Sequence, residues 1–388
     1  MKYWRGYLTA GILALITVGL MMIAERFSQL VDMVYPYVTR EVQFILADWT
    51  ATVDFTLWQV LVVGIILAIV VTLVLMITLK WNFFQWLGWV LAGASMIWLL
   101  HTGIYGLNYY AGPISDDVRL GSYEFTSEDL EEATIYFRDK ANELADSLKD
   151  SHRDTNGMLQ FDDFDTLAAQ AGQGFTAMAY EQSGSIFAGS TLPVKKLAWA
   201  DMYTAMGITG VTMPLTGEAA VNPQIPPISL PFTMCHEMAH RMCIATEDDA
   251  NFAAFLACLA NEDPQFQYSA YFMAFRYCYN ALVSAGTAET AAAAARINLE
   301  INEYLRYDLN QYNKFFSKHR DDTLTDIADA VNDTYIKVSG DENGTTSYAQ
   351  VSVYLVNWYL EEQVFPFEEE DSGFDPTDKD YVSGALGD

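Results

Sequence analysis

Residues 234–258 read MCHEMAHRMCIATEDDANFAAFLAC, and this stretch decides how the C-terminal part of the chain is built. Apolar residues recur at helical spacing on both sides of a short acidic run, which predicts two helices over about 230–244 and 247–261. Thr246 is followed three residues later by Asp249, a capping-box-like pair, so the second helix is expected to begin just after Thr246. The sequence therefore predicts two helices joined by a brief turn.

The first of these helices contains His236-Glu237-Met238-Ala239-His240. Two histidines four residues apart project from one helix face and can bind a single Zn²⁺ at about 2.0–2.1 Å each. Bound zinc lowers the pKa of its water from about 15.7 to about 7, and Glu237 lies where it can take that water's proton. The chain has only five histidines, so chance rarely produces this spacing. We predict Zn²⁺ as the cofactor and Glu237 as the catalytic base; the alternative is a His/Glu helix face that binds no metal.

A third protein ligand is needed, and the acidic run after the turn offers candidates. Glu247 opens the second helix, and its long side chain can swing back toward His236 and His240, so we predict it as the third ligand. Asp249 is the alternative, although a helix-capping position already gives it a structural role. Asn251 shares the face of Glu247 and could hydrogen-bond a ligand.

Three uncharged runs precede this region, over about 7–24, 57–79 and 83–107. Each is long enough to cross a hydrocarbon core of roughly 30 Å, which predicts three transmembrane helices in a multi-pass protein of the cell membrane. A cleavable signal peptide is the alternative for the first run, but its apolar stretch is too long. Lys2, Arg5 and Lys80 favour a cytoplasmic N-terminus, which places the rest of the chain outside the cytoplasm.

The charge is unevenly distributed along the chain, whose net value is −29. Residues 1–110 hold five bases and five acids, so all of the excess negative charge lies in residues 111–388. This acidity excludes nucleic acid as a partner, because phosphate binding needs clustered Lys and Arg.

The four cysteines lie within predicted helices. Cys235 and Cys243 are about 12 Å apart on one helix, too far for a disulfide, and we expect small buried side chains.

Other helices are expected over about 128–149, 162–180, 265–285, 287–318, 320–336 and 345–362, and the one convincing strand signal is 208–222. The chain is thus expected to be mainly α. We predict a bundle of three transmembrane helices in residues 1–110, a helical domain with a small β element in residues 111–362, and an acidic disordered tail in residues 363–388.

The segments GIYGLNYYAGPISDDVRLG (103–121), ITGVTMPLTGEAAVN (208–222) and HEMAH with EDDANFAAFLAC resemble bacterial membrane proteins of domain-of-unknown-function family 3810, over roughly residues 103–361. That family is itself similar to gluzincin-type peptidases. The resemblance implies a zincin-like domain, with His236, Glu237, His240 and Glu247 at the matching positions. It departs at Arg241-Met242-Cys243, where Gln-x-Gly is common and where Cys tolerates left-handed backbone less readily than Gly.

The expected function is therefore that of a membrane-anchored zinc metallopeptidase that hydrolyses a peptide or protein substrate at the lipid bilayer. Peptidases of this type often bind substrate as an added strand, which gives residues 208–222 a possible role, with Thr216-Gly217-Glu218 on the substrate side or forming only a β-turn. The alternative functions are a non-catalytic membrane protein that uses zinc for structure or sensing, and a zinc hydrolase acting on another amide. The sequence predicts no oligomeric state.

Overall fold

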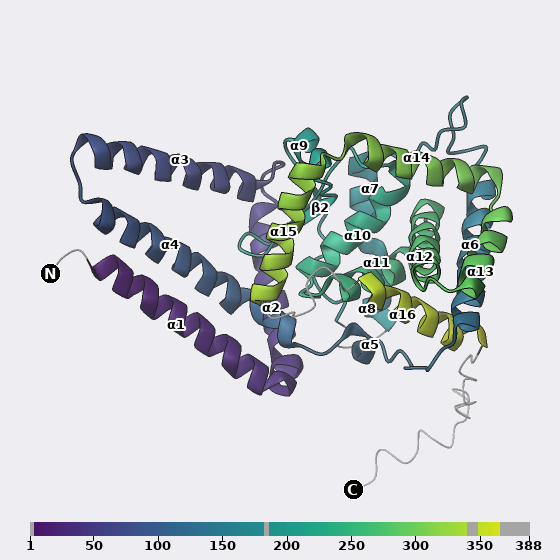
Figure 1. The fold of residues 1–388 in the computed structure, drawn as a ribbon, viewed down its shortest axis with the longest axis horizontal. Helices are drawn as coiled ribbons and strands as arrows, with labels where there is room; N and C mark the ends of the chain where they lie inside the picture. Colours follow the sequence, from purple (N-terminus) through teal and green to yellow (C-terminus); the bar gives the residue numbers. More distant parts are fainter. Residues whose placement is uncertain (1–3, 182–185, 340–347, 365–388) are drawn as a thin grey trace, which may run out of the picture.

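The computed structural model describes residues 4–181, 186–339 and 348–364, and the following statements concern these residues. Figure 1 shows three long helices that project to one side of a compact helical domain. The chain is mainly helical, as predicted, with one small sheet. The predicted acidic tail lies outside the described residues from position 365 onward.

The three projecting helices are α1 (Arg5–Arg26), α3 (Leu57–Thr78) and α4 (Phe83–Ile104). Each is long and apolar enough to span a membrane, which confirms the three predicted candidate spans. Helices α1 and α4 pack together, and a Cβ on Gly6 would lie 2.5 Å from the main-chain carbon of Gly88, so this crossing requires glycine. Helix α3 diverges from this pair (Figure 1) and contacts mainly the end of α4 that the turn joins to it.

A further long helix, α2 (Ser28–Thr50), follows α1 and was not predicted. It is less apolar than the spans, and its buried positions (Pro36, Thr39, Arg40, Gln43, Ala47 and Thr50) recur every three or four residues, which places them on one face. This face contacts the helical domain: the Gln43 amide donates to the Pro214 carbonyl at 3.1 Å, and the Thr50 hydroxyl donates to the Thr216 carbonyl at 3.2 Å. Helix α2 therefore joins the spans to the domain.

The core of the helical domain forms around three helices, α10 (Leu230–Arg241), α11 (Glu247–Leu259) and α12 (Pro264–Ser284). Phe252, Phe255, Phe272 and Phe275 are almost completely buried among them. Surrounding elements are η1 (Gly106–Tyr110), α5 (Ile114–Asp117), α6 (Ser127–Ser147), α7 (Phe164–Gln170), α8 (Gly172–Glu181), α9 (Ala200–Ala205), η2 (Pro227–Ser229), α13 (Ala288–Leu299), α14 (Glu303–His319), α15 (Asp322–Ser339), α16 (Tyr348–Tyr359) and a π-helical turn, Leu360–Val364.

Two predicted helices are each interrupted. The helix expected over 162–180 divides into α7 and α8 at Ala171, beside Gly172, where a Cβ would lie 2.7 Å from the Thr191 carbonyl oxygen. The helix expected over 287–318 divides into α13 and α14, because the Asn302 side chain accepts a hydrogen bond from the Leu305 N–H at 2.8 Å and caps a new helix. The four cysteines are buried and free, as predicted.

The small sheet contains β1 (Lys195–Lys196), β2 (Gly210–Met213) and β3 (Glu218–Val221) in the order β1-β3-β2. Strand β2 pairs with β3 in antiparallel register, and β1 pairs with β3 in parallel. The predicted single strand over 208–222 is thus a hairpin. At its turn, Gly217 has φ +67°, and a Cβ there would lie 2.6 Å from the Ala47 main-chain nitrogen in α2.

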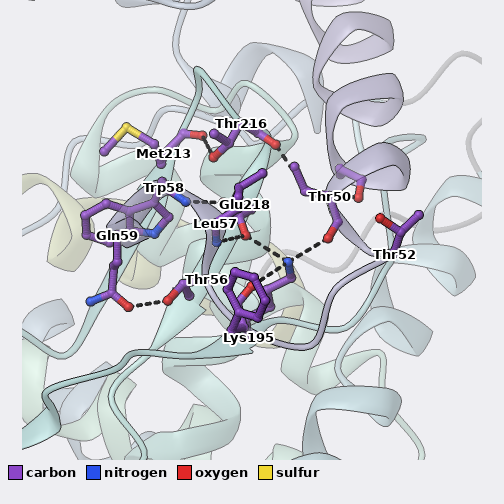
Figure 2. A network of polar contacts seen from close by, with 12 residues as sticks. Thr50, Thr52, Thr56, Leu57, Trp58, Gln59, Lys195, Met213, Thr216 and Glu218 are labelled. Atoms are coloured by element: carbon purple, nitrogen blue, oxygen red, sulfur yellow. Dashed lines mark hydrogen bonds and ion pairs between the residues drawn. The ribbon is translucent and has the colours of Figure 1, made fainter. Parts of the chain in front are cut away.

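A buried ion pair fixes this hairpin to the start of α3 (Figure 2). The Glu218 side chain is fully buried and accepts hydrogen bonds from the main-chain N–H groups of Leu57 and Trp58, each at 2.8 Å. Lys195 donates to Glu218 at 2.8 Å and to the carbonyls of Thr50 and Phe55. A carboxylate at a helix N-terminus satisfies otherwise unpaired N–H groups and complements the helix dipole. Thr216-Gly217-Glu218 therefore faces α2 and α3, in agreement with the β-turn alternative.

Candidate metal centre

Helix α10 carries the two histidines of the motif on one face, with His240 buried and His236 partly exposed. The Nε2 atoms of His236 and His240 are 3.1 Å apart, and the two rings meet edge to face. Nδ1 of His240 lies 2.8 Å from the Ile244 carbonyl oxygen, which it can approach only as an N–H donor. This bond orients the ring and leaves Nε2 as a ligand atom, the arrangement usual for metal-binding histidines.

Glu247 is the first residue of α11, and the structure brings it to the two histidines. Its Oε2 lies 3.3 Å from His236 Nε2 and its Oε1 lies 3.8 Å from His240 Nε2. Thr246 caps α11 by accepting a hydrogen bond from the Asp249 N–H at 3.4 Å, as predicted. Because the cap fixes where α11 begins, it also fixes the direction from which Glu247 reaches the imidazoles.

These three residues fit the donor set of a zinc site. One ligand atom from each of His236, His240 and Glu247 lies within 4.8 Å of the others. Ligands about 2.0–2.1 Å from a tetrahedral ion are about 3.3 Å apart, which is close to the separations of 3.1, 3.3 and 3.8 Å found here. Nδ1 of His236 is buried without a hydrogen-bond partner in the described part of the chain. No hydrogen bond therefore orients the His236 ring in the way that the Ile244 carbonyl orients the His240 ring.

The proximity of these groups shifts their pKa values. Burial alone would lower the pKa of His240, but hydrogen bonding and the negative charge of Glu247 outweigh it and raise that pKa to about 9. Burial would raise the pKa of Glu247, and the two histidines overcome this and hold it well below its ordinary value. The site therefore stabilises the Glu247 carboxylate, whose negative charge favours a positive charge beside it.

The carboxyl group of Glu237 is buried and lies against strand β2. Its Oε2 is 2.7 Å from the Thr212 hydroxyl, and a Cβ on Gly210 would lie 2.3 Å from its Oε1. Burial raises the pKa of Glu237, and the neighbouring His236 and His240 act in the opposite direction. Glycine at position 210 thus leaves the space that the Glu237 carboxyl occupies.

The turn between α10 and α11 contains a residue with left-handed backbone, a conformation that glycine usually adopts. Cys243 has φ +70°, and the Ile244 N–H donates to the Ala239 carbonyl at 3.2 Å, five residues back. This bond is typical of a Schellman C-cap with Cys243 as its left-handed residue. The departure from Gln-x-Gly therefore preserves the turn, and the Cys243 side chain is buried against Tyr105, just after α4.

The other acidic and polar candidates have different partners. Asp249 accepts a hydrogen bond from the Tyr354 hydroxyl at 2.9 Å, and Asp248 accepts one from the Val351 N–H at 3.2 Å, so both contact α16. Asn251 accepts a hydrogen bond from the Tyr277 hydroxyl at 3.1 Å. Among the described residues, Asp249 is not part of the group that His236, His240 and Glu247 form.

Sequence reasoning missed Thr212 and Gly210 as parts of the site. Both lie more than twenty positions before Glu237, in the segment 208–222, whose resemblance to the family assigns no role to either residue. Their apposition to Glu237 results from the packing of β2 on α10, and nothing in the local pattern predicts it.

Comparison with known families agrees with part of the sequence-based expectation. Residues 31–356 match the family model described as a protein of unknown function (DUF3810). The chain belongs to this family. The DUF3810 match begins within α2 and ends within α16, so it extends further toward the N-terminus than the motif resemblance and includes α3, α4 and every residue of the candidate metal centre. No curated protein and no solved structure matches the chain.

Proposed function

We propose that this DUF3810 protein is a membrane-anchored zinc-dependent metallopeptidase, in which His236, His240 and Glu247 hold the ion and Glu237 is the general base. The observation that carries the proposal is the convergence of three ligand atoms at near-tetrahedral separations, with the Glu237 carboxyl on the same helix. When bound, zinc would lower the pKa of water and polarise a carbonyl group. The neighbouring side chains determine how protons move.

The Glu237 carboxyl is prepared for proton transfer by its surroundings. Its raised pKa brings it closer to the pH at which a general base works best. Thr212 Oγ1 lies 2.7 Å from Glu237 Oε2 and 2.8 Å from the Glu237 carbonyl oxygen, and a hydroxyl has only one proton to donate. Thr212 can donate to the carboxylate before proton transfer, and it can accept from the carboxylic acid afterwards while donating to the carbonyl. Both protonation states of Glu237 are thereby satisfied.

Strand β2 offers a place for an extended substrate. In the sheet formed by the described residues, β2 is an edge strand that pairs only with β3. An edge strand presents N–H and C=O groups that an added peptide strand can pair with. Because Gly210 and Thr212 of β2 contact Glu237, a peptide bound along this edge would pass beside the catalytic carboxyl. This supports β2 as the substrate-binding strand.

The site is connected on two sides to ends of the spans. Val211 and Met213 of β2 pack against the cluster that includes Trp58, in the first turn of α3. On the other side, Cys243 and Ala245 pack with Tyr105, directly after α4. Tryptophan and tyrosine favour the membrane–water interface. These contacts support hydrolysis at the membrane surface.

The spans support an extracytoplasmic location for the site. Arg5 begins α1 and Lys80 lies in the turn between α3 and α4, and both are at the ends of the spans away from the helical domain (Figure 1). The positive-inside rule assigns those ends to the cytoplasm. In intact cells, a membrane-impermeant maleimide should label Ser151→Cys and not Lys80→Cys; the reverse labelling would contradict this orientation. All four native cysteines are buried, so the parent protein should show little background labelling.

A Glu237→Gln variant tests the proposed reaction. The full chain should bind one equivalent of zinc before and after the substitution, whereas hydrolysis of a peptide library should fall by about 10²–10⁴-fold. Equal activity of the two proteins would contradict the proposal. Absence of stoichiometric zinc in the parent protein would contradict it as well. If zinc binds but neither protein cleaves any peptide, the alternative of a structural or sensory zinc site is favoured.

A further inference from the structure

A polar pocket in the helical domain is lined by residues of α12 and α14 and by residues at the end of α13. These helices lie on the side of the domain away from the spans (Figure 1). The volume of the pocket is about 220 Å³. Its polar lining consists of Arg276, Arg306, Asn280, Asn298, Asn310 and Asn313. No acidic residue lines it within the described part of the chain, although the protein has 50 acids and only 21 bases. Arg276 and Arg306 therefore give the pocket a positive lining within an acidic domain.

Arg276 is held rigidly and keeps donors unused. Its guanidinium carbon lies 3.8 Å from the centre of the Tyr312 ring, and Nη1 donates to Asn313 Oδ1 at 3.1 Å. Nε is buried and has no hydrogen-bond partner among the described residues. A buried donor without a partner is costly, and a bound ligand or water usually accounts for it. Arg276 is therefore fixed in position with hydrogen-bonding capacity to spare.

Arg306 adds a second positive charge, which forms no ion pair with a carboxylate among the described residues. Its Nη1 donates to Asn298 Oδ1 at 3.2 Å, and its Nη2 donates to the main-chain carbonyls of Asn298 and Ile301, at the end of α13. By contrast, Arg138, Arg153 and Arg296 of the same domain form ion pairs with acids. The charge of Arg306 is stabilised by a helix C-terminus, which leaves it available to attract an anion.

We propose that this pocket binds a small oxyanion, the carboxylate or phosphate group of a small molecule. Guanidinium groups match the planar oxygen pairs of carboxylates and phosphates, and charge-assisted hydrogen bonds are roughly twice as strong as neutral ones. Asparagine amides provide both donors and acceptors for the rest of the ligand. A volume of about 220 Å³ admits a few non-hydrogen atoms beyond the charged group. The site is independent of the metal centre.

Thermal unfolding of the full chain in detergent tests this proposal. Inorganic phosphate and succinate are titrated separately, with sodium chloride holding the ionic strength constant. At least one of them should raise the midpoint in a saturable manner, by about 2–4 °C at several times its dissociation constant. A response to phosphate alone identifies a phosphate-bearing ligand, and a response to succinate alone identifies a carboxylate. If neither anion raises the unfolding midpoint above that measured in sodium chloride alone, the proposal is wrong.

Substitutions in and outside the pocket test whether the anion-dependent rise in the unfolding midpoint comes from binding there. Arg276→Gln should abolish it, and Arg296→Gln, which removes an exposed guanidinium outside the pocket, should leave it intact. Because Arg276→Gln also removes packing on Tyr312, a second variant is needed. Asn280 is exposed, and its side chain makes no hydrogen bond among the described residues. Asn280→Asp should abolish binding by repulsion, whereas Asn332→Asp adds the same charge on α15 and should not. Undiminished responses in Arg276→Gln and Asn280→Asp would overturn the proposal.

Discussion

The hydroxyl oxygen of Thr212 lies 2.7 Å from the Oε2 atom of Glu237, which joins the edge strand β2 to the helix that carries both histidines. The same hydroxyl lies 2.8 Å from the Glu237 carbonyl oxygen. One side chain therefore contacts both the main chain and the carboxyl of the proposed base. The orientation of Glu237 consequently depends on how the hairpin packs on α10.

Thr212→Val should impair the proposed base without removing it. Valine has nearly the shape of threonine but cannot hydrogen-bond the carboxylate, and the Thr212 bond lowers the pKa of Glu237. Its loss should move the acidic limb of the pH–rate profile to higher pH and reduce activity at neutral pH by about 10-fold. Thr212→Ser restores the hydroxyl and should restore the profile. A uniform loss of activity at every pH would show that Thr212 acts only in folding.

Glu218→Gln should destabilise the junction between the hairpin and α3. The substitution removes the negative member of the Lys195–Glu218 pair, in which Glu218 is fully buried. Lys195 is then left charged in a mostly buried position, at a cost of about 3 kcal/mol. Thermal or chemical unfolding measures this change. The neighbouring exposed pair Lys196–Asp165 is the matched control, and Asp165→Asn should cost at most about 1 kcal/mol. Equal effects of the two variants would contradict the anchoring role of Glu218.

Cys243 should respond to substitution according to its left-handed backbone. Cys243→Gly removes strain of about 1–2 kcal/mol but loses the buried contact with Tyr105, so the unfolding free energy should change by less than about 1 kcal/mol. Cys243→Val places a β-branched side chain at φ +70° and should destabilise by about 2 kcal/mol or more. Unfolding curves for the two variants provide the comparison. A valine variant as stable as the glycine variant would contradict the assigned geometry.

The stability of the protein should depend on pH through Asp117. Its carboxyl lines a small cavity of about 30 Å³ with Asp32 and Asp249, and burial together with these two carboxylates raises its pKa to about 6, against the opposing charge of Arg40. A raised folded-state pKa means that the folded protein binds more protons than the unfolded chain between about pH 4 and 6. The contribution of Asp117 to stability should therefore fall as the pH rises through this window.

Asp117→Asn is the variant that isolates this effect. It should raise the unfolding midpoint at pH 8 by roughly a degree or two, since solvent screens a partly exposed group, and should change it little at pH 4. Asp116→Asn is the comparison, because Asp116 does not line the cavity and its charge is the smallest of the named contributions to the raised pKa of Asp117, so its effect on the midpoint should be smaller. A larger gain for Asp117→Asn at pH 4 than at pH 8 would contradict the assigned direction of the shift.

The features determined by the sequence alone are local ones. The apolar runs determine α1, α3 and α4, because a span is defined by length and composition. The i, i+4 spacing places His236 and His240 on one face, and the Thr246 cap fixes where α11 and Glu247 begin. Each of these relations involves residues within a few turns of one another, so periodicity and capping rules suffice to predict them.

The tertiary structure alone decided the relations between distant segments. Thr212 reaches Glu237 across 25 positions, and Glu218 caps the start of α3 across about 160. The buried face of α2 is polar, so its sequence reads as a surface helix until the hairpin that it packs against is known. Such contacts depend on which faces meet when the chain folds. The spacing of residues therefore specified the ligands of the proposed metal centre, and packing specified the surroundings of its base.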